Sequence, residues 1–488
     1  MKSIDARRWS IAFVLLFSLG LNGVHAQFTT GMLLDDPSYA ALPQQSLYGD
    51  GGKSESQALE GVLKVDLRPY CPKPKNQGRI SSCVGWATGY AALSIQYAFQ
   101  KGWKNLPDSI NRNAFSALFI YNQIKINECG SGSYISEGLK FLAEKGDLRS
   151  SDFDLDVANC NVLPNTVQKE TALRHRVKEV TTLFGDMAEA YVKIYKTKLS
   201  LAQNKPVVIG MEIRANFQSL TGQDTYWFPD AGNTQSLGGH AMCVVGFDEG
   251  KGAFEVMNSW GEYWGQGGFI WIKYDDFARF CRYAAQFTLQ TAQGPVAGVR
   301  TGQFRVRQPV AIREGVIEFA EAKPVTATNR YLLQQPKGAR VQWTATGLTA
   351  GTYLYVFSFD PQKNIKVHWP RDESLDQAYS GKHESALVTT PQVELVIPTP
   401  QTAFTFNQPG KDHVVALVST RPITDLNTVL PKLKTAYQGD LAAALRTVFG
   451  SRLASATASG YRKDAFGFSS TAPANLIIPV ILEVTVSP

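Results

Sequence analysis

The chain has few of the residues that build metal and redox sites. It contains 6 cysteines and 6 histidines among 488 residues, and no two cysteines form a C-x-x-C pair. Zinc sites and thioredoxin-like redox motifs need ligands at such close spacing. The sequence therefore predicts no metal site, and nothing in it indicates a cofactor.

Long runs of one charge and long apolar runs are missing as well. The formal net charge is +7 at pH 7, and the excess of Lys and Arg is spread thinly over both halves of the chain. Nucleic-acid surfaces concentrate positive charge, so we expect a solvated basic surface and no nucleic-acid partner. No segment beyond residue 26 is apolar for long enough to span a bilayer, so stable membrane insertion is not expected.

The first 26 residues have the pattern of an export signal. Three basic residues precede an apolar run over residues 11–21, and small residues follow up to Ala26. The apolar run is too short to cross a bilayer, which favours a cleavable signal peptide over a membrane anchor. The sequence thus predicts a signal peptide over residues 1–26 and a periplasmic or secreted, extracellular protein.

The remaining chain divides into regions of different pattern. Residues 27–62 are rich in Gly, Ser, Gln and Asp, which predicts a flexible leader or a short prosegment. In residues 63–290 helical patterns come first and strand patterns later, which is typical of an α+β fold. Residues 291–301 resemble a linker. Residues 302–488 alternate short strands with turns, which predicts an all-β, sandwich-like domain with one helix over residues 439–449.

The hydrophobic periodicity predicts individual elements of the α+β region. The basic residues between Lys169 and Lys198 are expected on a solvated helix face. Helices are predicted at residues 84–100, 114–126, 135–145 and 186–203, and strands at residues 207–213, 241–247, 253–257, 269–273 and 285–289.

Four residues of this region provide the parts of a cysteine nucleophile site. Cys83 begins a helical pattern, and the positive end of a helix stabilises a thiolate. His240 begins an apolar strand and Asn258 ends the next one, so antiparallel pairing would let the Asn amide fix the imidazole tautomer. Gln77 lies in a Gly-containing loop, and its amide could bind an oxyanion together with the Cys83 N–H.

The stretches around these residues resemble the papain family of cysteine peptidases. The first stretch, residues 76–83, reads Asn-Gln-Gly-Arg-Ile-Ser-Ser-Cys. The second, residues 258–269, reads Asn-Ser-Trp-Gly-Glu-Tyr-Trp-Gly-Gln-Gly-Gly-Phe. His240 lies between these two stretches, which is the family's order of Cys, His and Asn. The resemblance covers about residues 65–289. It implies a two-lobed domain with a cleft between a helical and a barrel-like lobe. It also implies an endopeptidase that cuts polypeptide substrates through a thioester acyl-enzyme.

The same resemblance implies substrate contacts. The segment Cys-Gly-Ser-Gly-Ser-Tyr from Cys129 is similar to a family segment whose backbone pairs with the substrate, which indicates Ser131 and Gly132. Gly239, next to the predicted catalytic histidine, is expected to contact substrate as well. Trp260 is expected to line the site and to shield the hydrogen bond between the predicted His and Asn from water.

Three features depart from the family pattern. An aromatic residue usually follows the nucleophile, but here Val84 does, with Trp86 two residues later. Ser81 stands where the family has Gly. The long helical propeptide of many members is missing, and only residues 27–62 could take its place. These departures leave open a catalytically silent, papain-like peptide-binding module. A different cysteine hydrolase, such as a cell-wall amidase or a transglutaminase, is a third hypothesis.

The cysteines allow several pairings in a compartment that permits disulfides. If Cys83 is the nucleophile, five remain, and Cys243 is expected to be the unpaired one because it lies in an apolar run. The other four allow three connectivities. We favour Cys129–Cys160 and Cys71–Cys281.

The C-terminal region resembles a small β domain of bacterial exported proteins. The resemblance rests on residues 351–356 (Gly-Thr-Tyr-Leu-Tyr-Val), Trp369-Pro370 and Ile397-Pro398. It implies a binding or spacing role, with cell-surface contact as one possibility.

Overall fold

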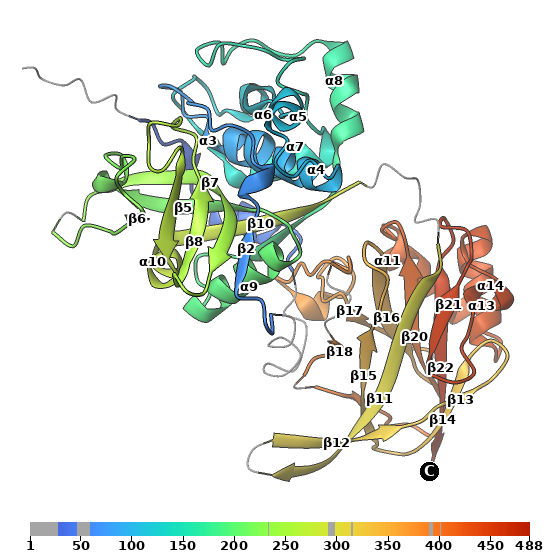
Figure 1. Ribbon diagram of the computed structural model, residues 1–488. Helices are drawn as coiled ribbons and strands as arrows, with labels where there is room; N and C mark the ends of the chain where they lie inside the picture. Colours follow the sequence, from blue (N-terminus) through green and yellow to red (C-terminus); the bar gives the residue numbers. More distant parts are fainter. Residues whose placement is uncertain are drawn as a thin grey trace, which may run out of the picture.

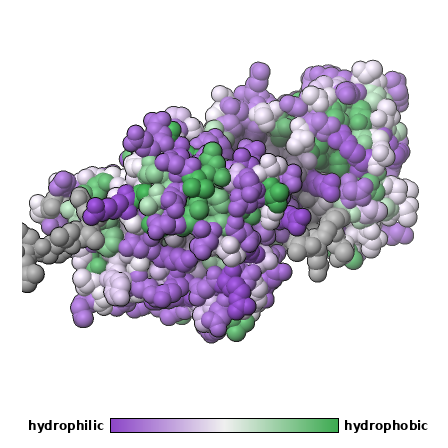
Figure 2. Space-filling model, turned by 90° about the horizontal axis from the view of Figure 1, so that it is seen from above, coloured by the Kyte–Doolittle hydropathy of each residue, from purple (hydrophilic) through white to green (hydrophobic). Residues whose placement is uncertain are grey.

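The computed structural model describes residues 28–45, 59–232, 234–290, 298–313, 316–389, 394–400 and 402–488. These residues form two domains, blue to yellow-green and yellow to red in Figure 1. The predicted signal peptide lies outside the described residues. Within the described residues no helix is both long and apolar enough to cross a membrane. The face seen in Figure 2 is mostly hydrophilic, with apolar patches on both domains.

The first domain has a helical lobe built around one buried helix. This helix runs without a break from Cys83 to Gln100, with π-helical backbone in its central turns. The residues from Trp86 to Leu93 are all buried, because the helix packs between α6 and strand β7. The predicted helix over residues 84–100 is confirmed. The helices of this domain are α1 (Asp36–Ala40), α3 (Cys83–Gly85), η2 (Trp86–Leu93), α4 (Ser94–Gln100), α5 (Pro107–Arg112), α6 (Ala117–Ile124), α7 (Ile135–Glu144), α8 (Thr166–Ala172), α9 (Ala190–Ala202) and α10 (Tyr274–Phe280).

The other lobe is a sheet with strand order β4-β10-β5-β7-β8-β9-β6, to which the short strands β1, β2 and β3 attach. Strand β7 is buried over most of its length and pairs antiparallel with both β5 and β8. The α+β class and the two lobes are as predicted. The strands are β1 (Met32–Leu33), β2 (Lys64–Asp66), β3 (Ser133–Tyr134), β4 (Val177–Phe184), β5 (Val207–Arg214), β6 (Tyr226–Trp227), β7 (Ser236–Asp248), β8 (Ala253–Met257), β9 (Phe269–Lys273) and β10 (Cys281–Leu289).

The predicted solvated helix face between Lys169 and Lys198 holds for Lys169 of α8, which is exposed, but is wrong for the later part of this stretch. Part of this stretch is strand β4, and Lys193 and Lys196 of α9 are only 4% and 8% exposed. Lys193 donates to the carbonyls of Ala278 and Cys281 at 3.1 and 2.8 Å. The aliphatic stems of these lysines pack in the domain while backbone carbonyls satisfy the ammonium groups, so a basic pattern did not mean exposure.

The cysteines pair only in part as predicted. Cys129 and Cys160 form a disulfide, and Cys243 is unpaired and buried. The predicted Cys71–Cys281 bridge is wrong, because both cysteines are free. The Cys281 thiol points to the carbonyl of Tyr283 at 3.3 Å within its own strand, where it is fully buried.

The second domain is a sandwich of two six-stranded sheets, as predicted, with helices on the outside (Figure 1). The prediction of one helix in this domain is wrong, because helices at Leu426–Val429, Leu433–Ala436 and Ala456–Ser459 accompany the one at Leu441–Phe449. Strand β16 is apolar along its length because both of its faces are covered. Leu354 and Val356 pack between the sheets, whereas Tyr355 and Phe357 pack against the helices. The elements are β11 (Arg300–Arg313), β12 (Val316–Ala322), β13 (Val325–Thr326), β14 (Tyr331–Pro336), β15 (Arg340–Thr346), β16 (Tyr353–Phe359), β17 (Ile365–Trp369), β18 (Leu395–Ile397), β19 (Phe404–Thr405), β20 (Gly410–Ser419), α11 (Leu426–Val429), α12 (Leu433–Ala436), α13 (Leu441–Phe449), α14 (Ala456–Ser459), β21 (Gly467–Ser470) and β22 (Ile478–Ser487).

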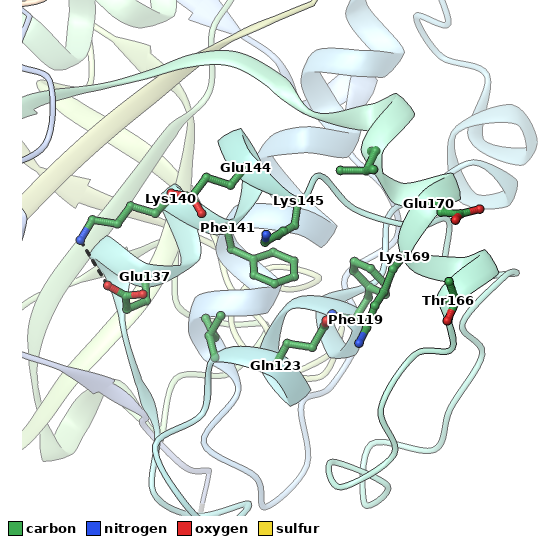
Figure 3. A pocket seen from close by; sticks show the side chains of 12 residues that line it. Phe119, Gln123, Glu137, Lys140, Phe141, Glu144, Lys145, Thr166, Lys169 and Glu170 are labelled. Atoms are coloured by element: carbon green, nitrogen blue, oxygen red, sulfur yellow. Dashed lines mark hydrogen bonds and ion pairs between the residues drawn. The ribbon is translucent and has the colours of Figure 1, made fainter.

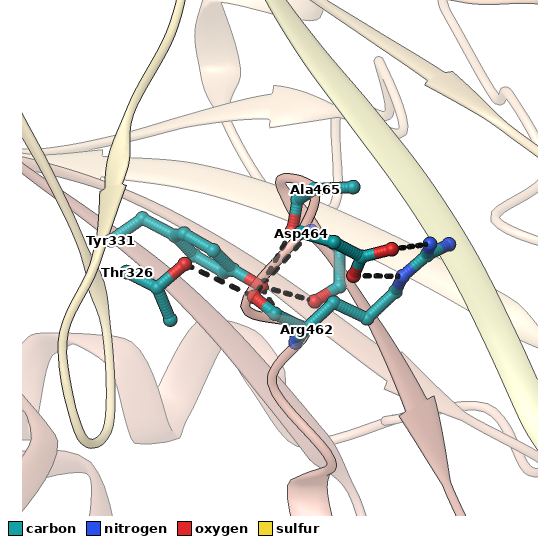
Figure 4. Close-up of polar contacts among 6 residues, drawn as sticks. Thr326, Tyr331, Arg462, Asp464 and Ala465 are labelled. Atoms are coloured by element: carbon teal, nitrogen blue, oxygen red, sulfur yellow. Dashed lines mark hydrogen bonds and ion pairs between the residues drawn. The ribbon is translucent and has the colours of Figure 1, made fainter.

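One tyrosine hydroxyl organises the loop before β21 (Figure 4). The Tyr331 oxygen accepts from the backbone N–H of Arg462 at 3.0 Å and of Gly467 at 3.1 Å. The hydroxyl also faces the carbonyls of Arg462, Ala465 and Gly467. The hydroxyl thereby gives the Gly467 N–H an acceptor and adds bonds to other backbone groups of the loop, around a ring that is 0% exposed.

Candidate active site

Cys83 lies at the first residue of the buried helix, on the side of the helical lobe that faces β7. The thiol is fully buried, and burial raises the pKa of Cys83 to about 11, although backbone groups of Ala241 and Gly31 oppose the shift. In this state the sulfur is a neutral thiol at neutral pH. The helix N-terminus therefore does not suffice to ionise it while the site is closed.

His240 and Asn258 meet because β7 and β8 pair antiparallel. His240 Nε2 lies 2.8 Å from Asn258 Oδ1, and this oxygen also accepts from the Ser259 N–H at 2.8 Å. Because Asn258 Oδ1 accepts both hydrogen bonds, the ring proton of the neutral His240 is assigned to Nε2. Nδ1 then carries a lone pair and no proton. Nδ1 has no hydrogen-bond partner among the described residues. Burial lowers the pKa of His240 to about 4, so the ring is neutral.

Gln77 is held by the same segment that carries the Asn. Its Oε1 accepts from the Ser259 hydroxyl at 2.6 Å, and its backbone N–H donates to the Ser259 carbonyl at 2.8 Å. The side chain is 0% exposed. With Oε1 engaged, Nε2 points away from Ser259 as a donor, which is the group that an oxyanion needs.

Trp260 covers the histidine from one side. Its ring stacks on the His240 ring with centroids 4.6 Å apart and is itself 1% exposed. Phe28 stacks on the same Trp at 4.9 Å with nearly parallel planes. The bond between His240 and Asn258 is thus covered by the Trp260 ring.

The first described residues of the leader lie in this site. Met32 of β1 pairs in parallel with Ser133 and antiparallel with Gly239, so the leader is a strand between the two lobes. The Ser133 N–H donates to the Gly31 carbonyl at 2.9 Å. Met32 is 3% exposed, and its sulfur lies where a side chain at Gly210 would be, so a glycine there makes room for it.

The leader also occupies the donors. The Thr29 carbonyl accepts from Gln77 Nε2 at 3.1 Å and from Trp260 Nε1 at 3.2 Å. The Thr29 hydroxyl donates to the Ile80 carbonyl at 3.0 Å. Of the two donors that sequence reasoning assigned to an oxyanion, Gln77 Nε2 is therefore already bonded to a peptide carbonyl of the chain itself.

The predicted substrate contacts are partly occupied by the leader. Gly132 has φ +75°, and a Cβ there would lie 2.3 Å from the Gly31 carbonyl oxygen, so only glycine fits. Gly239 pairs with the leader. Ser131 makes no hydrogen bond to the described part of the leader; its hydroxyl accepts from the Glu128 N–H at 3.0 Å. Sequence reasoning missed Ser133 and the leader strand, for which the apolar residues 32–34 within a polar leader were the available signal.

The departures from the family pattern have packing roles. Val84 is fully buried against Gly138, where a larger side chain on Gly138 would collide with it. The Ser81 hydroxyl donates to the Gly130 carbonyl at 3.0 Å. Trp86 donates to the Ser82 hydroxyl at 3.1 Å. None of these changes removes a catalytic group.

A cavity of about 690 Å³ lies among α6, α7 and α8 (Figure 3). Phe119 and Phe141 line it, whereas Lys140 pairs with Glu137 at 3.3 Å. None of the predicted catalytic residues lines this cavity, so it has no part in the chemistry described above. In the part of the chain that the structure describes, no group of three or more His, Cys, Asp or Glu could hold a metal ion.

Comparison with known proteins places the first domain in a family. Residues 63–291 match the papain family of cysteine proteases. An uncharacterised peptidase C1-like protein of Acanthamoeba polyphaga mimivirus is 30% identical over 230 residues, which cover 44% of this chain and 70% of that protein. Ananain of Ananas comosus is 25% identical over 258 residues, which cover 50% of this chain and 60% of ananain.

Solved structures of cysteine proteases resemble the same part of the chain. Xylellain, a cysteine protease from Xylella fastidiosa, has 21% identity and a TM-score of 0.44, over 55% of this chain and 97% of xylellain. With a family match across the first domain and a relative at 30% identity, this chain belongs to the papain family of cysteine proteases and is a cysteine peptidase.

Proposed function

We propose that this chain is an exported endopeptidase that hydrolyses peptide bonds through Cys83, His240 and Asn258, and that residues 28–33 keep it inactive. The observation that carries the proposal is the Thr29 carbonyl, which accepts from Gln77 Nε2 at 3.1 Å. A peptide strand already lies between the lobes with a carbonyl on the proposed oxyanion donor. A substrate strand would use the same donor once the leader has left.

The chemistry follows from the tautomer of His240. With Nε2–H bonded to Asn258, Nδ1 keeps its lone pair and makes no hydrogen bond with the described residues in this closed state. Once the leader has left, Nδ1 would take the proton of the Cys83 thiol. The sulfur then attacks the scissile carbonyl carbon, and Gln77 and the Cys83 N–H stabilise the oxyanion. His240 returns the proton to the leaving amine as the C–N bond breaks. Water hydrolyses the thioester and restores the thiol.

The leader would inhibit in two ways. It fills the space that a substrate strand needs, and it buries the reacting groups. Burial raises the pKa of Cys83 to about 11 and lowers the pKa of His240 to about 4, so both groups are neutral. Removing the leader would readmit water and favour the thiolate and the imidazolium.

The direct test compares the mature chain with a variant that lacks residues 28–33. We expect the variant to be labelled at Cys83 by an epoxide-type thiol inhibitor and to cleave a denatured protein, and the mature chain to react much more slowly. A folded variant that is neither labelled nor active would exclude the proposal. A peptide-library profile of the variant would define the preferred substrate.

The silent-module hypothesis has less support, because Gln77, His240 and Asn258 are placed together and the departures at Ser81 and Val84 serve packing. Cleavage by the wild type but not by Cys83→Ala would exclude it. A peptidoglycan-release assay tests the amidase hypothesis. Export, and cell-surface contact through the β domain, remain predictions.

A further inference from the structure

The leader is anchored at a second place, far from the cleft, where the two domains meet. The Gln44 N–H donates to the His383 carbonyl at 2.7 Å, and the Ser385 N–H donates to the Gln44 carbonyl at 3.0 Å. Gln44 thus forms a parallel bridge with Glu384 of the second domain. This is β-strand addition, in which the backbone provides the contact.

The same short segment pairs with the first domain on its other side. The Thr182 N–H of β4 donates to the Pro43 carbonyl at 2.7 Å, and the Gln45 N–H donates to the Thr182 carbonyl at 2.8 Å. The buried Lys196 ammonium donates to the Gln45 carbonyl at 2.7 Å. Residues 43–45 are therefore held between β4 and the β domain by hydrogen bonds to both.

Side chains around this segment join the domains directly. The Ser385 hydroxyl donates to the Glu179 carboxylate of β4, and Ser385 is 6% exposed. The Lys178 ammonium donates to the Gly351 carbonyl and lies 5.0 Å from the centre of the Tyr353 ring. A displacement of the β domain would expose these polar groups and break the Gln44 bridge together.

Little free chain separates the two anchors. Leu33 ends the strand in the cleft, and Pro43 begins the junction segment. Helix α1 lies between them, and its Tyr39 hydroxyl donates to the Ala284 carbonyl at 2.5 Å. The leader is thus fixed along its described length, so loosening one end raises the entropic cost of keeping the other end ordered.

We propose that the β domain holds the leader in the cleft, through the pairing of residues 383–385 with Gln44, and that separation of the β domain from β4 releases residues 28–33. This inference rests on the proposed function, in which those residues block the site. It gives the β domain a regulatory role: an event that pulls on or displaces this domain would open the peptidase.

The test compares Ser385→Pro with Ser385→Ala in the mature chain that retains the leader. Both variants lose the hydroxyl bond to Glu179, but only the proline variant also loses the N–H that donates to Gln44. Gln44→Pro is the second test, because it removes the N–H that donates to His383 and leaves the β domain unchanged. The readouts are the alkylation rate of Cys83 by iodoacetamide and the hydrogen exchange of residues 29–33.

We expect Cys83 to be alkylated about tenfold faster in both proline variants than in Ser385→Ala, because a tenfold change corresponds to the loss of one well-satisfied hydrogen bond. Hydrogen exchange of residues 29–33 should also be faster in the proline variants. Equal rates and unchanged exchange in all three would overturn the proposal. Neither readout needs peptide hydrolysis, so an inactive enzyme would not affect this test. If the variant that lacks residues 28–33 is alkylated no faster than the mature chain, blockage by the leader is excluded instead.

Discussion

The two domains differ in how their sequences specify them. The proposed site of the first domain consists of a few side chains, Gln77, Cys83, His240 and Asn258, that lie on segments far apart in the sequence. The second domain depends on a periodic apolar pattern in which Leu354 could be exchanged for another apolar residue of similar size. A catalytic site therefore leaves a local motif in the sequence, whereas a sandwich core leaves only its period. The comparison predicts that substitutions at these four residues lower activity without lowering stability. Substitutions in the sandwich core should lower stability without lowering activity.

The largest effect is expected at the nucleophile. Cys83→Ala in the variant that lacks residues 28–33 should lower kcat/KM by at least about 10³-fold, because the attacking atom is gone. Cys243→Ala is the matched control, since that thiol is also fully buried and unpaired. Its kcat/KM should change by less than about threefold. A similar loss in both variants would mean that packing, not chemistry, limits activity.

The second effect is on the pH dependence of the thiol. With a Cys83 pKa of about 11 in the closed state, only roughly one thiol in ten thousand is ionised at pH 7. Alkylation should rise with pH and level off only above pH 11. In the variant without residues 28–33 the raised pKa falls, so the same curve should move to lower pH. Mass spectrometry of Cys83 alkylated at each pH measures both curves. Coincident curves would contradict the burial argument.

The disulfide should have an effect on stability rather than on chemistry. Replacing Cys129 and Cys160, 31 residues apart, by Ser should lower the free energy of unfolding of the first domain by about 3–4 kcal/mol, by the entropy of the closed loop. Urea unfolding followed by hydrogen exchange of the first domain measures it. Cys71→Ser is the control, because Cys71 is free. If Cys71→Ser lowers the free energy of unfolding as much as the double replacement does, the stabilisation does not come from the disulfide.

The smallest effect is expected in the second domain. Tyr331→Phe should lower its free energy of unfolding by about 1–3 kcal/mol, because the Gly467 N–H loses its acceptor and the Arg462 N–H keeps only the Gly467 carbonyl. Tyr461→Phe should have little effect, because the Tyr461 hydroxyl has no partner within the described ranges. Hydrogen exchange of β22 measures the change. Both substitutions, made in the enzyme that lacks residues 28–33, should leave its rate of cleavage unchanged. A loss of activity would contradict the conclusion that the second domain's core affects stability alone.

Sequence patterns predicted the regular elements well where one period dominated. The strands at residues 253–257 and 269–273 have the predicted bounds. Strand β4 was missed because its half-buried Lys178 and Glu179 interrupt the apolar pattern at the domain junction. Tertiary contacts, which a local pattern does not contain, decided that segment.

Each of the four central residues of the candidate site is tied to a motif. The position of the leader was not predictable, because residues 27–62 as a whole are polar and their apolar run, residues 32–34, is short. The contacts that hold it combine backbone pairing with Ser133 and Gly239 and side-chain bonds from Gln77 and Trp260 to the Thr29 carbonyl. Backbone pairing carries almost no sequence signal, so neither the cleft anchor nor the Gln44 junction was visible in the sequence.

The stacking of Phe28 on Trp260 gives the molecule an optical readout of its own. The Trp260 indole is 1% exposed and donates to a leader carbonyl, so departure of the leader would transfer this chromophore from a dry aromatic contact into water. Its emission should then shift to longer wavelength. Stopped-flow fluorescence could therefore time the opening of the enzyme before any bond is cut.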